Sequence, residues 1–404
     1  MSLDETCQNL TSFTCPICRC SEGRALGEAF FQVIDGSAID GKMRLIACAS
    51  CGLVRSQTSS GVKDYNEYYE SSSYSREYLS KPLPSRDKEY LRNIASDLKT
   101  FMRASDDLVV DLGCGAGHLL TTLRELGSSR LLGLDVSASC CRLIEELHGI
   151  PCRQSSFNTL PAELKTARIL VLSHVLEHIP NLDEALTSIR NSLSDDGYLY
   201  VEVPDTSLFE KYTNGYPLKM LFLLHLTHFS PLSLRNLMTS FQFEVLNSGT
   251  RVRYEFDVPI PCAWLVCRKG VGSSFVRDTA LPERFALWVR EKKLDPNGEL
   301  ALLAREQSPT YVWGLGAHAQ IALGMSPLKD CNVVGFIDRS YSQSGSTIRG
   351  VAIQGPDILK KLKKGDTVVI AALSHAPEMT RSLEEIGFSG KVIVLDMGNY
   401  SEPG

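Results

Sequence analysis

The chain lacks any apolar run approaching the roughly 18 residues that a membrane-spanning helix needs. Its first ten residues (MSLDETCQNL) contain neither the basic segment nor the apolar segment of a secretory signal. Basic residues do not predominate either, since 42 Lys and Arg against 47 Asp and Glu give a formal charge of −5. These absences argue against a membrane partner, and also against a nucleic-acid partner, which requires a strongly cationic face. We therefore expect a cytoplasmic protein.

Disulfide bonds rarely persist in the cytoplasm, so we expect the 13 cysteines to be thiols or metal ligands. Cys15 and Cys18 (CPIC) form one CxxC turn, and Cys48 and Cys51 (CASC) form a second about thirty residues later. Four sulfur ligands fill a tetrahedral zinc site, which predicts a structural Zn²⁺ stapling a small β-ribbon. Four unrelated buried thiols are the alternative, and Cys20 is a weaker competitor of Cys18.

The central stretch of the chain is VVDLGCGAGH, an apolar strand that breaks into a glycine turn and leads into a helical pattern. We expect Asp111, Gly113, Gly115 and Gly117 to bind a nucleoside there, with Asp135 of LLGLD accepting the ribose hydroxyls. An acidic residue before the glycines is unsuited to a pyrophosphate. It suits S-adenosylmethionine, which carries a sulfonium and an ammonium group. The motif therefore predicts a methyl-donor site.

Strands and helices alternate through the middle of the chain, which predicts an α/β domain with a mostly parallel sheet. Expected strands cover 108–112, 131–135, 169–173 and 198–203, and expected helices cover 88–102, the residues up to 127, 138–148 and 182–194. Ligands of such sheets lie at the carboxyl ends of the strands. Ser173 and the pair Ser156 and Phe157 are thus further candidates for donor binding, with Gln154 and Ser155 as alternatives to that pair.

With 404 residues the chain is long enough for two or three domains. We predict a zinc-binding module over 1–62, a donor-binding core over 63–270 and a second, Rossmann-like domain over 271–404. That last domain should start with one broken or two short helices in 275–306. Expected strands follow near 311, at 332–338, at 367–372 and at 391–395. Its WGLGAHA turn and Asp338 formally match a dinucleotide fingerprint, so NAD has to be considered.

Several separated motifs resemble known methyltransferases. DLGCGAGH, GLD, HVLEHI and GYLYVEVPD are similar to the class I S-adenosylmethionine-dependent methyltransferases. Together with CPIC, CASCGLV, YYESSSYS, HLTHFSPLSL and WGLGAHA, the chain resembles the nucleotide-sugar 3-C-methyltransferases of deoxysugar pathways over nearly its whole length. The resemblance implies a zinc module, a methyltransferase core and a C-terminal domain that helps to hold a nucleotide sugar instead of NAD.

The same resemblance implies roles for four side chains. His225 corresponds to the general base, and His178, Tyr69 and His228 are candidate hydrogen-bond donors or positioning groups. Tyr69 belongs to the segment 65–78, which we expect to be a polar connecting loop or a flap over the substrate.

The chain departs from this family at Phe222 and Leu224, where the family has Tyr and Glu. Without that carboxylate, His225 is expected to lack an orienting partner. Carbon methylation at C3 of a 4-keto sugar is the leading prediction. Oxygen methylation of a sugar or natural-product hydroxyl is the alternative, and a non-catalytic binding protein that kept the fold is a third. The oligomeric state is left open.

Overall fold

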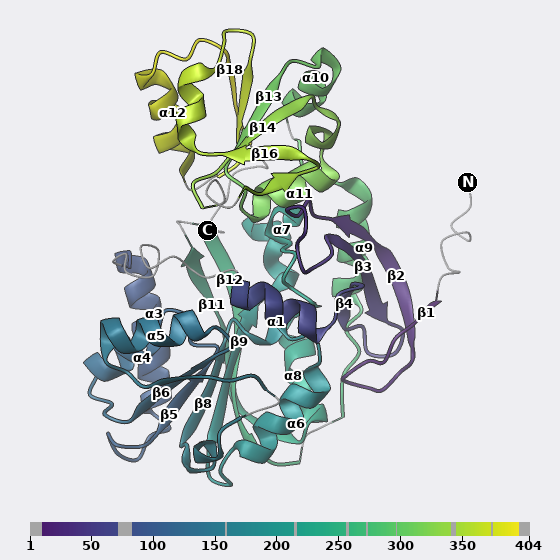
Figure 1. The fold of residues 1–404 in the computed structure, drawn as a ribbon. Coiled ribbons are helices and arrows are strands. Elements are labelled where there is room, and N and C mark those ends of the chain that lie inside the picture. Colours follow the sequence, from purple (N-terminus) through teal and green to yellow (C-terminus); the bar gives the residue numbers. More distant parts are fainter. Residues whose placement is uncertain are drawn as a thin grey trace.

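A computed structural model describes residues 10–71, 83–157, 160–213, 216–255, 258–271, 274–295, 297–340, 345–372 and 375–395. In these ranges the chain forms three β-sheets, and each sheet has helices packed against it (Figure 1). The central sheet lies at the lower left of the view, the amino-terminal sheet at the right and the carboxyl-terminal sheet at the top. No described helix is long and apolar enough to cross a membrane.

The amino-terminal sheet is antiparallel and has the strand order β1-β2-β3-β4-β10. Its strands are β1 (Leu10–Ser12), β2 (Glu22–Phe30), β3 (Lys42–Cys48), β4 (Val54–Gln57) and β10 (Thr227–His228). Strands β2 and β3 lie in or at the end of the segment between the two CxxC turns, where the ribbon was predicted. Strands β1 and β4 flank those turns, and β10 comes from the segment HLTHF far along the chain. The ribbon is therefore larger than expected, because a strand of the predicted catalytic loop completes it.

The central sheet has the order β11-β12-β9-β8-β5-β6-β7, and β12 runs antiparallel to its neighbours. Its strands are β5 (Val109–Leu112), β6 (Leu131–Asp135), β7 (Cys152–Gln154), β8 (Ile169–Ser173), β9 (Tyr198–Pro204), β11 (Phe243–Glu255) and β12 (Val258–Lys269). The connection between β5 and β6 runs one way across the sheet and that from β7 to β8 runs back. The carboxyl ends of β5 and β8 thus form the switch point where such sheets bind ligands.

Helices of the central unit begin and end at residues suited to those positions. They are α3 (Ser85–Lys99), α4 (His118–Glu125), α5 (Ala138–His148), α6 (Leu182–Ser192) and α8 (Pro231–Ser240). The Ser137 hydroxyl accepts the amide of Cys140 at the start of α5, and Asn181 accepts that of Glu184 at the start of α6. Ser230 and Ser233 form a capping box at α8.

The carboxyl-terminal sheet has the order β15-β16-β14-β13-β17-β18, with only β15 antiparallel to its neighbour. Its strands are β13 (Thr310–Trp313), β14 (Val333–Ile337), β15 (Thr347–Ile348), β16 (Val351–Gln354), β17 (Thr367–Ile370) and β18 (Lys391–Val394). Helices α9 (Ala280–Glu291) and α10 (Glu299–Glu306) precede it, and α11 (Ala317–Met325) and α12 (Ala376–Glu385) follow strands of it.

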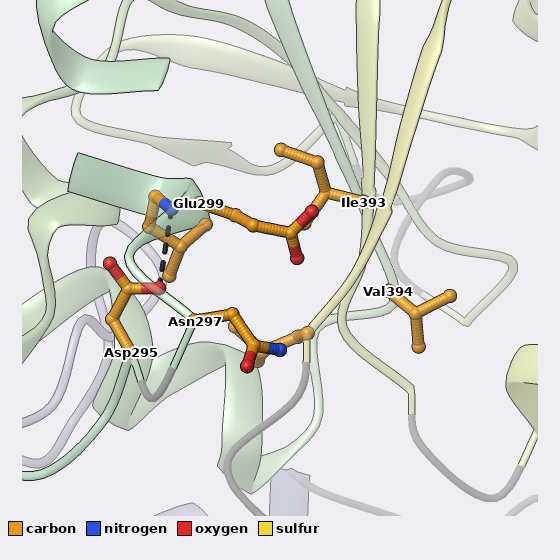
Figure 2. A pocket seen from close by; sticks show the side chains of 7 residues that line it. Asp295, Asn297, Glu299, Ile393 and Val394 are labelled. Atoms are coloured by element: carbon orange, nitrogen blue, oxygen red, sulfur yellow. Dashed lines mark hydrogen bonds between the residues drawn. The ribbon is translucent and has the colours of Figure 1, made fainter. Parts of the chain in front are cut away.

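A small hollow lies where α10 meets β18, lined by Asp295, Asn297 and Glu299 on one side and by Ile393 and Val394 on the other (Figure 2). Its volume of about 10 Å³ is close to the space that one water needs. Asp295 accepts the amides of Leu300 and Ala301 there, so this carboxylate caps α10. The hollow is therefore a helix-capping feature and too small for a substrate.

The three sheets share hydrophobic cores. One buried cluster runs without a break from the amino-terminal sheet through Phe285 and Trp288 of α9 to Val312 and Phe336 of the carboxyl-terminal sheet. A second cluster joins the cysteines of the CxxC turns to the central sheet. Hydrogen bonds reinforce these contacts, since Asp35 accepts the Thr347 hydroxyl at 2.7 Å. The predicted boundaries at 62 and 270 stay predictions, because burial alone does not divide the chain there.

The expectation of a loop over 65–78 is wrong for its first half. Residues up to 71 form helix α1 (Val62–Ser71), which lies beside β4 in Figure 1. Tyr65 is fully buried in the core that the amino-terminal sheet shares, so this tyrosine is a packing residue of a helix. Residues 72–78 lie outside the described residues.

Candidate functional site

The glycine turn follows β5 and leads into α4. Asp111 lies in β5 and is 5% exposed. Gly113, Gly115 and Gly117 all adopt positive φ angles of 77°, 51° and 72°, which side-chain-bearing residues rarely adopt. A Cβ added to Gly113 would lie 2.6 Å from Cγ2 of Val175, whereas one added to Gly115 meets nothing within 4 Å. The turn therefore packs against the loop after β8 on one side and faces open space on the other.

Asp135 ends β6 and holds this turn in place. One carboxylate oxygen accepts the amide of Gly115 at 3.0 Å and the other accepts the amide of Ser137 at 2.9 Å. Each carboxylate oxygen has two lone pairs, so both retain capacity for a ribose hydroxyl. Burial raises the pKa of Asp135 above its usual range. Asp135 thus shapes the glycine turn and keeps the capacity to accept further hydrogen bonds.

The pKa of Asp111 is raised to about 7, first by burial and then by the neighbouring Asp135. Such a carboxyl group is poised to ionise when a cation comes close to it. The ammonium and sulfonium groups of S-adenosylmethionine provide positive charge of this kind. The electrostatics of the turn therefore fit the predicted donor and do not fit a pyrophosphate.

The remaining donor-site candidates surround the same edge of the sheet. Ser173 ends β8, next to β5. The residues after β7 turn back toward β6, where the amide of Ser155 donates to the carbonyl of Asp135 at 2.9 Å. Ser156 and Phe157 follow in that loop, and the Phe157 ring packs against the core of the central sheet. Gln154 donates to the carbonyl of Val136, so both alternatives named for this loop also lie beside β6.

Three of the four predicted catalytic side chains converge. His178 lies in the short helix η2 (Leu176–His178) after β8, and its Nδ1–H donates to the carbonyl of Leu224 at 3.0 Å. Its ring centroid is 4.8 Å from that of His225 and 6.3 Å from that of Tyr69 in α1. Burial lowers the pKa of His178 to about 4 and, together with the nearby His178, lowers the pKa of His225 well below its usual value. Both imidazoles are therefore neutral at physiological pH.

His228 lies apart from these three. It is 2% exposed, and its ring packs against Phe285 of α9 with a centroid separation of 4.8 Å. Its Nε2 is 2.8 Å from the Ser56 hydroxyl, which in turn donates to the carbonyl of His225 at 3.2 Å. Because the hydroxyl hydrogen is used on that carbonyl, Nε2 of His228 is the donor to Ser56. His228 therefore contributes a buried hydrogen bond that joins β10 to β4.

A buried carboxylate that sequence reasoning missed lies beside the converging histidines. Glu177 precedes His178, its side chain is 2% exposed, and neither of its carboxylate oxygens has a hydrogen-bond partner. Oε1 is 3.5 Å from Nδ1 of His174 and 3.8 Å from Nε2 of His178. Glu177 and His225 also reach within 4.8 Å of each other, but Glu177 makes no hydrogen bond to that ring, so the expectation that His225 lacks an orienting carboxylate stays a prediction.

The signal for Glu177 was present in the sequence. It is the one charged residue in the apolar stretch VLEHI, and it lies three residues after His174. Burial raises its pKa to about 8. An acidic residue in such a stretch needs a partner, and the two flanking histidines were the evident candidates.

A second buried carboxylate supports the same loop from the neighbouring strand. Glu202 of β9 is 0% exposed, accepts the phenol of Tyr200 and pairs with the Arg251 guanidinium at 3.2 Å. Its other oxygen is 3.4 Å from Nε2 of His174. Nε2 of His174 is also 3.2 Å from the phenol oxygen of Tyr90, which lines a groove of about 630 Å³ between α3 and β11. His174 therefore connects the buried carboxylates to an open groove.

The carboxyl-terminal sheet also reaches the site. Phe222 packs edge-on against His225 with a centroid separation of 5.0 Å, and the ring of His318 is 6.4 Å from that of Phe222. His318 lies in the first turn of α11, directly after the glycine turn of WGLGAHA. In that turn the amide of Leu315 donates to Asp338 at 3.0 Å, as Gly115 donates to Asp135. Sequence reasoning did not single out His318, because nothing local to it indicates which sheet it faces.

The four cysteines of the CxxC turns meet at one point. Sγ of Cys15 is 3.5 Å from that of Cys51, and Sγ of Cys18 is 3.4 Å from that of Cys48. Four sulfurs bound tetrahedrally at about 2.3 Å from a zinc ion are about 3.8 Å apart. The cluster could thus hold a metal ion, and Cys20 is not part of it.

Comparison with known proteins supports the central domain. A family model described as a methyltransferase domain matches residues 86–248, and a second, described as the amino-terminal part of C2185-like proteins, matches residues 308–394. No curated protein matches the chain.

Solved structures resemble part of the chain at low identity. A methyltransferase from Methanosarcina mazei is 17% identical over 43% of this chain and 97% of its own, with a TM-score of 0.37. The 1,6-didemethyltoxoflavin-N1-methyltransferase of Burkholderia thailandensis is 16% identical over 47% and 93%, with a TM-score of 0.33. Magnesium protoporphyrin IX methyltransferase from Synechocystis is 14% identical over 50% and 95%, with a TM-score of 0.37.

The family match covers the strands and loops that carry Asp111, Asp135 and the histidine cluster. The chain contains a class I methyltransferase domain, and it is an S-adenosylmethionine-dependent methyltransferase.

Proposed function

We propose that this enzyme methylates C3 of a nucleotide-linked 4-keto-deoxysugar, by way of an enolate. The observation that carries the proposal is the contact between the glycine turn and the loop after β8, where Gly113 packs on Val175. In this proposal the contact brings His178, His225 and Tyr69, which converge on one another, beside the methyl donor. The resemblance to nucleotide-sugar 3-C-methyltransferases supplies the substrate class.

Asp111 and Asp135 would hold the donor, which supplies an electrophilic methyl group when bound. The C3 proton of a 4-keto sugar is acidic because the neighbouring carbonyl stabilises the carbanion as an enolate. His225 is the general base in this proposal, since its ring is neutral at physiological pH and can accept that proton. His178 and Tyr69 lie where they can position the sugar or donate to the enolate oxygen.

Exchange of the C3 proton tests this proposal. The full-length enzyme is mixed with a nucleotide-linked 4-keto sugar in deuterated water, with S-adenosylhomocysteine replacing the donor. Proton NMR should show loss of the C3 signal, and His225→Gln should slow that loss by about 100-fold or more. Absence of exchange on every 4-keto sugar tried would contradict carbon methylation.

Oxygen methylation is the second candidate, and the residues at 222 and 224 favour it. Phe222 places a ring without a hydroxyl against His225, and Leu224 offers only its backbone carbonyl to His178. In this case His225 takes a hydroxyl proton, and no ketone is needed. Mass spectrometry of products from 4-keto and 4-hydroxy nucleotide sugars separates the two candidates. The third expectation, a non-catalytic binding protein, is dropped because the chain is a methyltransferase.

We also propose that Cys15, Cys18, Cys48 and Cys51 bind one structural Zn²⁺, because all four ligand positions of a tetrahedral site are then filled by sulfur. Elemental analysis of the purified enzyme should find one zinc per chain at these cysteines, and Cys48→Ser should lose it.

The carboxyl-terminal sheet is proposed to be a Rossmann-like domain that closes over the nucleotide sugar. His318, placed near Phe222, is the described residue that supports this role. NAD is not favoured, because the resemblance to the nucleotide-sugar 3-C-methyltransferases implies a domain that helps to hold the nucleotide sugar instead. Saturation-transfer NMR should detect binding of a nucleoside diphosphate, weakened in His318→Ala, and no binding of NAD.

A further inference from the structure

We propose that Glu177, His178 and His225 form a binding site for one divalent first-row transition metal ion, which contacts an oxygen atom of the methyl acceptor. The three side chains each offer a ligand atom, and these atoms lie within 4.8 Å of one another. The ion's role in methyl transfer rests on the proposed function, but its binding does not.

The state of the Glu177 carboxylate is the first argument. Its side chain is 2% exposed, and neither oxygen has a hydrogen-bond partner. Buried carboxylates are normally satisfied by several donors, by a cation or by a metal ion. The nearest ring nitrogens, on His174 and His178, lie at 3.5 and 3.8 Å and do not satisfy it. A cation between these groups would.

The separation between Glu177 and His178 is the second argument. A distance of 3.8 Å from Oε1 to Nε2 is too long for a hydrogen bond. Two ligands bound to one ion at about 2.0–2.2 Å each lie roughly 3–4 Å apart. The observed distance is therefore compatible with two groups that share an ion.

The hydrogen bond of His178 is the third argument. Nδ1–H donates to the Leu224 carbonyl at 3.0 Å, which fixes the ring and leaves the lone pair of Nε2 directed away from that bond. Metal-binding histidines are held in the same way, with one ring nitrogen bonded to a backbone carbonyl or carboxylate and the other on the metal. Position 224 thus contributes its carbonyl, which the change from Glu to Leu leaves unaffected.

The ligand set leaves room for substrate. Two imidazoles and one carboxylate occupy three positions of a four- to six-coordinate ion, as in catalytic zinc sites and other open sites. The His178 side chain is 25% exposed, so the cluster opens to solvent on that side. An acceptor oxygen could therefore reach the ion from that exposed side.

With the ion bound, His225 would be a ligand, so the role of general base given to it in the proposed function would pass to a water molecule. Binding of a ketone oxygen to a divalent cation acidifies the proton on the neighbouring α-carbon. Binding of a hydroxyl oxygen acidifies its own O–H proton. That proton leaves to water, the methyl group passes from sulfur to the acceptor carbon or oxygen, and S-adenosylhomocysteine leaves. No oxidant or reductant is involved.

Manganese binding tests the site without relying on activity. The four cysteines prefer softer ions, so Mn²⁺ reports on the oxygen and nitrogen cluster. Electron paramagnetic resonance of the chelator-treated full-length enzyme should show one bound Mn²⁺ per chain. Glu177→Gln, which keeps the shape but removes the charge, should weaken Mn²⁺ binding by about tenfold or more, and Glu177→Asp by less.

Glu202→Gln is the matched control, because Glu202 is equally buried and also lies beside His174, yet pairs with Arg251. It should leave Mn²⁺ binding within about twofold of the wild type. Absence of bound Mn²⁺, or equal weakening in both variants, would overturn the metal site. Bound Mn²⁺ without methyl transfer to any sugar nucleotide would leave the site standing and contradict only the proposed function.

Discussion

Nε2 of His228 lies 2.8 Å from Oγ of Ser56, and this bond joins β10, which follows His225, to β4 of the amino-terminal sheet. The Ser56 amide also donates to the carbonyl of Leu226, and its hydroxyl donates to that of His225. The loop that carries His225 is therefore held by residues near the start of the chain. The position of His225 should depend on the integrity of that sheet.

Ser56→Ala tests this dependence. The substitution leaves the buried Nε2 of His228 and the His225 carbonyl without their partner, which costs about 1–3 kcal/mol. We expect a melting temperature lower by several degrees and a raised KM for the acceptor, with the Kd of S-adenosylmethionine unchanged. Ser59→Ala is the control, since that hydroxyl is exposed and bonds to the exposed Asp40. Equal effects of the two variants would contradict the proposed support.

Removal of the proposed zinc should also destabilise the amino-terminal sheet, which holds the loop that carries His225. Cys51→Ser should lower the zinc content and reduce the melting temperature by roughly 10 °C, because structural zinc contributes folding free energy directly. Donor binding, measured by calorimetry, should persist at temperatures where the variant is folded, since the donor turn lies on the central sheet. Cys20→Ser should keep full zinc and the wild-type melting temperature. Loss of zinc in that variant instead would reassign the ligand set.

Gly113→Ala should weaken donor binding by about tenfold or more, because φ is 77° and the added Cβ would lie 2.6 Å from Val175. Gly149→Ala is the matched control, since Gly149 has a φ of 60° and nothing within 4 Å of an added Cβ. Combining Gly113→Ala with Val175→Ala removes the clash and should recover part of the affinity. A double variant as weak as the single one would show that the backbone angle alone matters.

The pKa of Asp111, raised to about 7, predicts a pH-dependent donor affinity. Below that value the carboxyl is protonated and offers no charge to the donor, so affinity should fall by up to about tenfold per pH unit as pH drops below about 7. Asp111→Asn should remove this dependence and bind the donor roughly 100-fold more weakly at pH 8. Calorimetry from pH 5.5 to 8.5 measures both. A wild-type affinity that does not change with pH would refute the charge pairing.

The same group predicts how stability changes with pH. Because the folded pKa of Asp111 exceeds its unfolded value of 3.8, the folded chain holds more protons between about 4 and 7. The contribution of this group to stability is therefore full at low pH and is lost as pH rises through about 7. Donor-free Asp111→Asn should melt higher than the wild type at pH 8.5, by a smaller margin at pH 5.5, and close to it only below about pH 4.

Much of the central domain could be predicted from the sequence. The expected strands at 131–135 and 169–173 and the expected helix at 138–148 match β6, β8 and α5, because apolar runs and capping residues are local signals. Helix α1 was missed because its tyrosines and serines gave it the composition of a loop. The strand β10 was missed because two residues carry no pattern, and only pairing with β4 makes them a strand.

Some residues of the candidate site could also be predicted from the sequence, and others could not. The glycine turn and Asp135 could be predicted, since their spacing follows from one strand–turn–helix unit. The isolation of His228 could not, because it depends on Ser56, 172 residues away. Glu177 was hidden for a different reason. The histidines nearest to it in sequence also lie near it in the structure, but its burial beside His225 arises only when the loops after β8 and before β10 meet.

The pairing of β10 with β4 also limits how a new acceptor specificity could arise. A recombination event that exchanged the His225 loop alone would bring a strand that no longer matches the sheet it must join. Evolution of this enzyme toward other acceptors should therefore have kept the first sixty residues and that loop together, although more than 150 residues separate them in the chain.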